Sequence, residues 1–302
     1  HYSSRRQRQM CIRDRRQLDF RRVAAPPTRP HAPPALRDAP STSRRRRLAM
    51  SRTNQSRASI PSYAELVQTH GADAFFELAN APKFAFENLV LAQDANAREH
   101  CGGIVWESAF CLAKYLRERS VGLVRSSKRG KKALEVGCGC GLLGLVLARD
   151  FAFDEVVMTD QSRVLENVTR ENVEMNRKEI GGAATALHVM ALDWEVEEEL
   201  KAVSERGPFD VVVGTDVLFG VHLVAPLLRV IERTLSDTRK SAVCYICVQR
   251  RSPDAHDEFL RLAGEKFAVV AVEKALVAFS EDDECEIFEL RWKRAKKRKS
   301  VD

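Results

Sequence analysis

Two patterns of apolar residues alternate along the second half of the chain. Short runs such as "EVVMTD" and "DVVVG" are mostly apolar, whereas the longer segments between them repeat apolar residues every three or four positions. Nearly continuous apolar runs are typical of parallel strands buried on both faces, and the longer period is that of amphipathic helices. This alternation predicts a doubly wound, Rossmann-like α/β fold.

The pattern predicts a seven-stranded sheet. We expect strands over residues 132–137, 155–160, 184–193, 209–219, 241–249, 267–273 and 285–292. We expect helices over residues 104–119, 141–151, 162–179, 224–236 and 252–266. A short N-terminal extension comes first: residues 59–80 read as irregular with a short helix, and residues 82–94 as an extended hairpin.

Charge is concentrated at the two ends of the 302-residue chain. The formal net charge of +7 combines +13 in residues 1–58 and +6 in residues 291–302 with −12 in residues 59–290. The predicted domain is therefore acidic, and we expect only non-specific contact of the basic tail with nucleic acid. No apolar run reaches the roughly 18 residues of a membrane span, so we expect no membrane partner.

The ends of the chain are expected to lie outside the domain, which we place at residues 59–292. Residues 5–14, "RRQRQMCIRD", match the translation of a common transposase sequencing adapter codon for codon, so we interpret residues 1–15 as an artefact. Residues 16–58 are rich in Pro, Ala and Arg and are predicted to be disordered, as is the tail over 293–302. Met50 is the candidate start.

The cysteines predict neither a disulfide framework nor a metal site. Without Cys11, which lies in the adapter-like segment, seven remain, and an odd number favours free buried thiols. Cys244 and Cys247 have CxxC spacing, but they lie inside a predicted buried strand. A second cysteine pair and nearby histidines at zinc spacing are missing from the sequence around them.

The candidate chemistry lies in "LEVGCGCGLLG", residues 134–144, which joins the first strand of the sheet to a helix. Ligands of open α/β sheets bind at this edge, and the glycines permit a tight turn that a ligand can approach closely. A dinucleotide site requires GxGxxG, but Gly141 comes one residue early and Leu142 stands in the glycine position. Asp160, at the end of the next strand, can accept the ribose hydroxyls of NAD or of another nucleoside.

The form ExGxGxG resembles motif I of the class I S-adenosylmethionine-dependent methyltransferases. "GGIVWESAFCLAKYL" (residues 102–116), "ALDW" (191–194) and "FDVVVGTDVLF" (209–219) are similar to family 16 of these enzymes, the eukaryotic protein-lysine methyltransferases. The resemblance covers about residues 83–292. It implies a class I methyltransferase fold, S-adenosyl-L-methionine as cofactor and a lysine-bearing protein as substrate.

The resemblance also implies roles for single residues. Those implied for the cofactor are Trp106, Glu135, Gly137, Cys138, Gly139, Asp160, Asp193, Trp194 and Thr215. Those implied for catalysis are Asp216 and Phe219, the ends of a DxxY motif in which phenylalanine replaces the tyrosine. Asp216 can hold the incoming ammonium or orient its loop. Phe219 cannot donate a hydrogen bond, but its ring can still shape a narrow apolar channel.

We therefore expect a monomeric protein-lysine N-methyltransferase in the cytoplasm, the nucleus or both. The basic run Lys293–Lys299 resembles a nuclear localisation signal, although a solvated charge run is the simpler explanation. Two alternatives stay open: a methyltransferase acting on a small molecule or a non-lysine protein site, and a cofactor-binding scaffold without activity. A nicotinamide dehydrogenase is the weakest alternative because of Leu142.

Overall fold

The computed structural model describes residues 60, 62–71, 74–94, 101–119, 130–181, 185–274 and 284–293. The adapter-like segment, the Pro/Ala/Arg-rich segment and the basic tail beyond Lys293 lie outside these residues, so the interpretations given for them stay predictions. Within the described part of the chain, no helix has the length and apolar character needed to cross a membrane.

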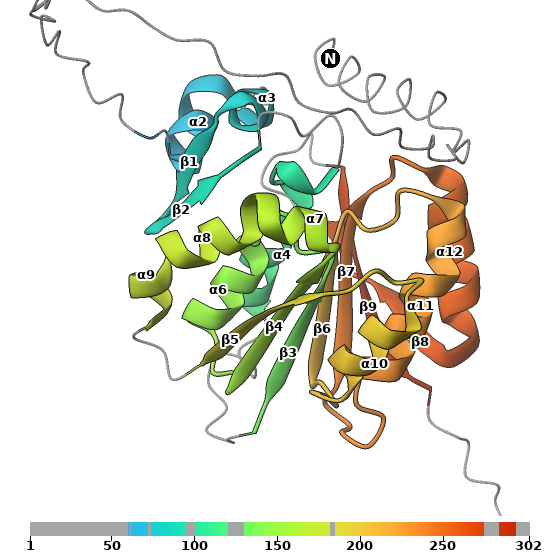
Figure 1. The fold of residues 1–302 in the computed structure, drawn as a ribbon. Coiled ribbons are helices and arrows are strands. Elements are labelled where there is room, and N and C mark those ends of the chain that lie inside the picture. Colours follow the sequence, from blue (N-terminus) through green and yellow to red (C-terminus); the bar gives the residue numbers. More distant parts are fainter. Residues whose placement is uncertain are drawn as a thin grey trace, which may run out of the picture. The chain divides into compact units, whose positions relative to one another are not determined.

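A seven-stranded sheet forms the centre of the fold (Figure 1). Its strands lie in the order β5 (Ala186–Ala191), β4 (Glu155–Asp160), β3 (Lys132–Val136), β6 (Val211–Thr215), β7 (Val243–Gln249), β9 (Cys285–Trp292) and β8 (Phe267–Ala271). Neighbours from β5 to β7 are parallel, and β9 is antiparallel to β7 and β8. The strand order reverses at β3, so the carboxyl ends of β3 and its neighbours form the edge where ligands bind. The predicted fold class and all seven strands are confirmed.

Helices cover both faces of the sheet (Figure 1). One face carries α4 (Glu107–Arg119), α6 (Leu142–Asp150) and the helical segment 162–181; the other carries α10 (Glu197–Ser204), α11 (Val221–Thr234) and α12 (Pro253–Lys266). Val211 and Val213 of β6 belong to the first core and Val212 to the second. Burial on both faces explains why the strands are nearly continuous apolar runs.

The same alternation excludes a shared metal ion at the CxxC spacing of β7. Cys244 lies in one core and Cys247 in the other, because residues three apart on a strand point to opposite faces. Both cysteines are buried and form no disulfide bond, and burial raises the pKa of Cys244. Among the described residues, no three His, Cys, Asp or Glu side chains are grouped so as to hold a metal ion.

Several predicted helices differ from those observed. The helix expected over 162–179 is divided into α7 (Ser162–Val164), a π turn (Leu165–Thr169), α8 (Arg170–Met175) and α9 (Arg177–Gly181). Residues 59–80 contain two helices, α2 (Tyr63–His70) and α3 (Ala74–Asn80). The sequence did not predict α10, whose acidic segment buries Leu200 and Val203.

The predicted hairpin is confirmed as β1 (Lys83–Phe86) and β2 (Leu89–Ala92), and two asparagine amides bind the edge of β2. Asn172 accepts from the N–H of Ala92 at 2.7 Å and donates to its carbonyl at 3.0 Å. Asn176 makes the same pair of bonds to Val90, at 2.8 and 2.7 Å. Four helical residues rise about 6 Å and two strand residues about 6.7 Å, so the two spacings match.

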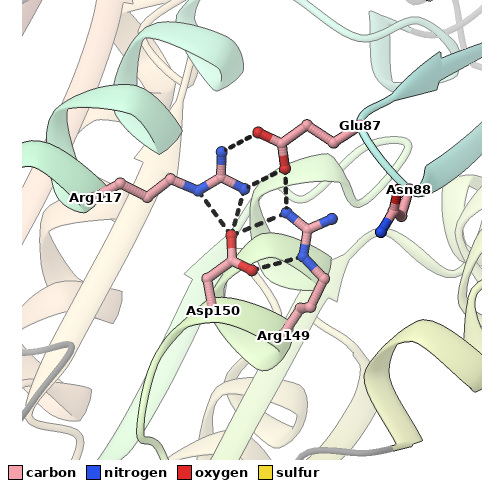
Figure 2. Close-up of a pocket in the computed structure, with 5 residues that line it drawn as sticks. All are labelled: Glu87, Asn88, Arg117, Arg149 and Asp150. Carbon is pink, nitrogen blue, oxygen red and sulfur yellow. Dashed lines mark hydrogen bonds and ion pairs between the residues drawn. The ribbon is translucent and has the colours of Figure 1, made fainter.

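A closed network of charges fixes the turn of the hairpin (Figure 2). Arg117 of α4 and Arg149 of α6 each donate to both Glu87 and Asp150. Burial alone would raise the pKa of either carboxyl, but the two guanidiniums lower the pKa of Glu87 and of Asp150 below the usual values. Two cations and two carboxylates balance, so this cluster is a structural clamp between the hairpin and two helices.

We expect Asn176→Ala to lower the free energy of unfolding by about 1–3 kcal/mol, because the backbone N–H and carbonyl of Val90 lose their partner. Urea unfolding measures the loss, and hydrogen exchange should show faster exchange at Val90. Glu171→Gln is the control, since it removes only the exposed 3.3 Å ion pair to Lys83 on the same hairpin. That change should cost less than about 1 kcal/mol. Equal effects of the two substitutions would contradict the role given to Asn176.

Candidate active site

The glycine loop between β3 and α6 has a backbone that few residues other than glycine adopt. Gly137, Gly139 and Gly141 have φ of 67°, 51° and 84°. A Cβ atom on Gly139 would lie 3.1 Å from the carbonyl oxygen of Gly102, and one on Gly141 would lie 2.5 Å from the Cε of Met158. The cysteines between the glycines are buried, as expected of small filling residues. The loop is therefore a close-fitting backbone turn at the switch point of the sheet.

Side chains from the next helical segment hold the carbonyls of this loop. Thr169 donates to the carbonyl of Gly139 at 2.7 Å, and Asn172 donates to that of Cys140 at 2.8 Å. Asn172 thus connects the loop to β2 as well. Neither residue was predicted from the sequence to contact the loop. Their positions depend on the π turn, which changes the face that each residue presents.

Two aspartates lie beside the loop at the ends of adjacent strands. Asp160, which ends β4, accepts from the N–H of Gly139 at 2.8 Å. Asp193, just beyond β5, accepts from the side chain of Gln161 at 3.2 Å and from the N–H of Glu195 at 3.0 Å. Gln161 follows Asp160 directly, so one dipeptide connects the two acids. The fold thus brings together Asp160 and Asp193, both selected from the sequence. Gln161, which was not selected, binds Asp193.

Glu135 lies below the loop, inside the core. Its side chain faces Gly144 of α6, and a Cβ atom there would be 2.5 Å from Oε2. Burial raises the pKa of Glu135 to about 8, although the N–H of Gly144 opposes the rise and Asp160 adds to it. Oε2 is buried and makes no hydrogen bond within the described part of the chain. A carboxyl group in this position is protonated through much of the neutral range.

The glycine loop contacts the segment that follows β6. A Cβ atom on Gly137 would lie 2.9 Å from Val217 and 3.6 Å from the ring of Trp194. Trp194 is 9% exposed, and its ring centroid is 6.3 Å from that of Phe219. The predicted cofactor tryptophan therefore shares one region with Val217 and Phe219 of the DxxF segment. Thr215, half-buried, ends β6 immediately before this segment.

Asp216 has a left-handed backbone with φ of 52°, which is uncommon for a residue other than glycine. Its Oδ1 accepts from the N–H of Gln249 at 3.0 Å, and its Oδ2 lies 3.5 Å from Nη2 of Arg251. Burial raises the pKa of Asp216, whereas Arg251 and the Gln249 N–H oppose that rise. Gln249 also donates to Glu107 at the start of α4. The carboxylate is thus held between the ends of β6 and β7.

Trp106 lies on the same side of the site as Asp216, because Arg251 contacts both residues. Its indole donates to the carbonyl of Cys101 at 2.9 Å, and the guanidinium carbon of Arg251 lies 4.6 Å from its ring centroid. The resemblance implied a cofactor contact for this ring, and in the structure a guanidinium lies against it. Arg251 was not selected from the sequence. Two consecutive arginines directly after a strand are typical of an exposed turn, so the sequence offered no reason to select Arg251.

The site therefore has a donor half and an acceptor half at one edge of the sheet. The glycine cradle, the unpaired Oε2 of buried Glu135 and the strand-end Asp160 fit a nucleoside with an amino-acid tail, as in S-adenosylmethionine. In the acceptor half, Asp216 offers a buried carboxylate, and Arg251 contacts both this carboxylate and the ring of Trp106. Such a carboxylate can hold a cation and accept a proton from it.

Comparisons of the sequence with known proteins identify its family. The model of the family described as "Lysine methyltransferase" matches residues 85–266. Protein N-lysine methyltransferase METTL21A of Danio rerio is 29% identical over 217 residues, which cover 70% of this chain and 85% of that protein. The Mus musculus METTL21A is 32% identical over 63% of this chain and 79% of its own length. A histidine protein methyltransferase 1 homolog of Dictyostelium discoideum is 28% identical, over 53% of this chain and 47% of its own length.

We expect the stability gained from Glu135→Gln to grow as the pH rises from 5 to 8. The folded protein holds the proton of Glu135 up to a pKa of about 8, whereas the unfolded chain releases it near 4.5. The wild type therefore loses roughly 3–4 kcal/mol of stability as the pH rises through this window, and the glutamine variant does not. Urea unfolding at four pH values measures it. Glu174→Gln, an exposed control, should show a constant difference, and so would Glu135→Gln if the carboxyl were already ionised.

We expect Asp160→Ala to weaken binding of S-adenosylmethionine by at least about tenfold. The Gly139 N–H loses its charged acceptor, and the carboxylate that we expect to accept the ribose hydroxyls is removed. Calorimetry measures the affinity. Asp257→Ala, which removes an exposed carboxylate paired with Arg250, is the matched control. A thermal shift with NAD should be absent in both variants and in the wild type. Unchanged affinity of Asp160→Ala would remove Asp160 from the donor half.

Proposed function

The chain belongs to the lysine methyltransferase family and is a protein-lysine N-methyltransferase, and from this premise we propose how its two halves divide the reaction. The family and the activity expected from the sequence motifs are confirmed. The family and the fold imply S-adenosylmethionine as the methyl donor, which supplies an electrophilic methyl group when bound. The assignments that follow are proposals about single residues.

The donor half comprises the glycine loop with the residues around it. The backbone of Gly137, Cys138 and Gly139 would form the cradle, and Asp160 would accept the ribose hydroxyls. Trp194 and Asp193 would contact the base. Glu135 supports the loop from below, and Thr215 closes the cradle on the side of β6. These roles rest on the positive φ angles and on the contacts of the loop.

One observation supports the proposal most directly: the glycine loop of the donor half is in contact with the segment that follows β6 and contains Asp216. A Cβ atom on Gly137 would lie 2.9 Å from Val217, the neighbour of Asp216. A nucleophile held by Asp216 is therefore close to any group held at the end of β3. Methyl transfer is an in-line displacement, for which a protein contributes chiefly the relative position of the reactants.

The acceptor half must also convert the ammonium group of the substrate lysine into a neutral amine. A lysine with a pKa of about 10.4 costs roughly 4.6 kcal/mol to deprotonate at pH 7. We propose that Oδ2 of Asp216 accepts the proton, so that a carboxylate and an ammonium become a carboxylic acid and an amine. Burial raises the pKa of Asp216, which makes this carboxylate a better proton acceptor than an exposed one. The proton then leaves to solvent.

The target is proposed to be a lysine on a basic protein surface. Residues 59–290 carry a net charge of −12, which favours encounter with a cationic partner. Localisation in the cytoplasm, the nucleus or both is proposed on the basic run Lys293–Lys299. Phe219 lacks the tyrosine hydroxyl of the motif, so the ring is proposed to line the channel for the lysine stem.

The function is tested with labelled S-adenosylmethionine and a cell lysate, followed by mass spectrometry of the labelled proteins. We expect label on lysine, and a loss of about 10²-fold or more in Asp216→Asn, because the general base is removed. Asparagine is chosen because it tolerates positive φ and can still accept from Gln249. Its affinity for S-adenosylmethionine should equal that of the wild type.

Asp257→Asn, the same change at an exposed position, should keep full transfer. Label on histidine, arginine or a metabolite would overturn the lysine assignment. Wild-type transfer by Asp216→Asn would remove Asp216 from the reaction, and cofactor binding without transfer by the wild type would indicate an inactive scaffold.

A further inference from the structure

Arg251 follows β7 directly, and its guanidinium occupies the acceptor half of the site. Its central carbon is 4.6 Å from the ring centroid of Trp106, and Nη2 is 3.5 Å from Oδ2 of Asp216. An aromatic face and a carboxylate are the partners that an alkylammonium ion also finds favourable. The guanidinium therefore occupies a position that would also be favourable for the ammonium group of a lysine.

The guanidinium is weakly held in this position. Within the described part of the chain, its one hydrogen bond is the 3.5 Å contact to Asp216, at the long limit for such a bond. Nε is buried and lacks a partner there. The side chain is 27% exposed, whereas that of Asp216 is 6% exposed. A guanidinium has five N–H donors, so most of its bonding capacity is unused here, and its departure breaks one long hydrogen bond.

Asp216, by contrast, is fixed. Its backbone N–H donates to the carbonyl of Cys247 at 2.8 Å, and its Oδ1 accepts from the N–H of Gln249. A buried carboxylate without a cation is costly, which explains why a cation rests beside it in the free protein. A second cation that reaches the same carboxylate can replace the first without leaving the charge uncompensated.

We propose that Arg251 is a specificity-determining residue, which occupies the cation position of the acceptor site in the free enzyme and yields it to the ammonium group of the target lysine. The inference rests on the proposed function, since it assigns the acceptor to this site. It also restricts the acceptor. A neutral side chain cannot compensate Asp216 and so cannot displace the guanidinium, whereas a protonated lysine can.

The test uses n-butylammonium as a probe for the lysine side chain, with the full chain saturated with S-adenosylhomocysteine. Binding is followed by nuclear magnetic resonance at pH 8, where an alkylammonium is still charged. We expect Arg251→Gln to bind the probe about tenfold more tightly than the wild type, because the resident competitor is gone. Arg250→Gln is the matched control: its guanidinium pairs with Asp257 at the surface, and its affinity should equal that of the wild type.

Two further arms separate charge from space. Butan-1-ol, which has the shape of the probe without its charge, should bind Arg251→Gln no more tightly than the wild type. The gain for n-butylammonium should vanish in the double variant Arg251→Gln with Asp216→Asn. Equal gains for the alcohol, or a gain that survives in the double variant, would overturn the proposal. So would an Arg251→Gln protein that binds S-adenosylhomocysteine normally and the probe no more tightly.

If Arg251→Gln fails to fold, Arg251→Met removes the charge and keeps an apolar stem on Trp106, and the same outcomes apply to it. The probe experiment requires no turnover. A failure of lysine methylation in the lysate experiment therefore overturns the proposed function, whereas a failure of the probe to bind more tightly overturns only the role of Arg251.

Discussion

The left-handed backbone of the glycine loop is the constraint on which the ligand-binding edge of the sheet depends. Three positive φ angles within five residues turn β3 into α6 without leaving room for side chains. Such a turn keeps its shape only if its peptide groups find partners. Those partners come from elsewhere: Asp160 at the end of β4 takes one N–H, and Thr169 and Asn172 take two carbonyls. The loop is thus formed by its neighbours as much as by its own sequence.

This arrangement makes the N-terminal hairpin part of the same construction. Asn172 binds β2 with the amide that also binds the loop, and Asn176 repeats the contact one helical turn later. The charge network of Arg117, Arg149, Glu87 and Asp150 holds the other end of the hairpin. The hairpin precedes the sheet in sequence, but it braces the element that holds the cradle. Position in the chain therefore gives little guide to which segments support the site.

The sequence predicted the fold well because burial on both faces leaves a strong signal. The seven strands are apolar enough to be recognised one by one, and parity alone places Cys244 and Cys247 on opposite faces of β7. Segments with a weaker apolar signal were missed. The helix α10 buries only two side chains. The π turn ends at Thr169, which contacts the glycine loop, and no local pattern reveals that contact.

The site was predicted in part, for the same physical reason. Glycines, strand-end acids and the DxxF segment are local features, and the structure brings them to one edge. Arg251 was not predicted because its role depends on contacts with Trp106 and Asp216, which lie 145 and 35 positions away in sequence. Trp106 was expected to meet the cofactor, and its observed neighbour is that arginine. Long-range contacts of charged side chains are set by tertiary structure, so local patterns in a single sequence do not predict them.

The distribution of thiols has a practical consequence. Among the cysteines of the described residues, Cys101 is exposed and the other six are buried. Burial raises the pKa of Cys138 and Cys140, so these two thiols are poor nucleophiles in neutral buffer. Cys101, whose carbonyl receives the indole N–H of Trp106, is therefore a native attachment point for a maleimide dye. A fluorophore placed there would report on the surroundings of Trp106 without any change to the natural sequence.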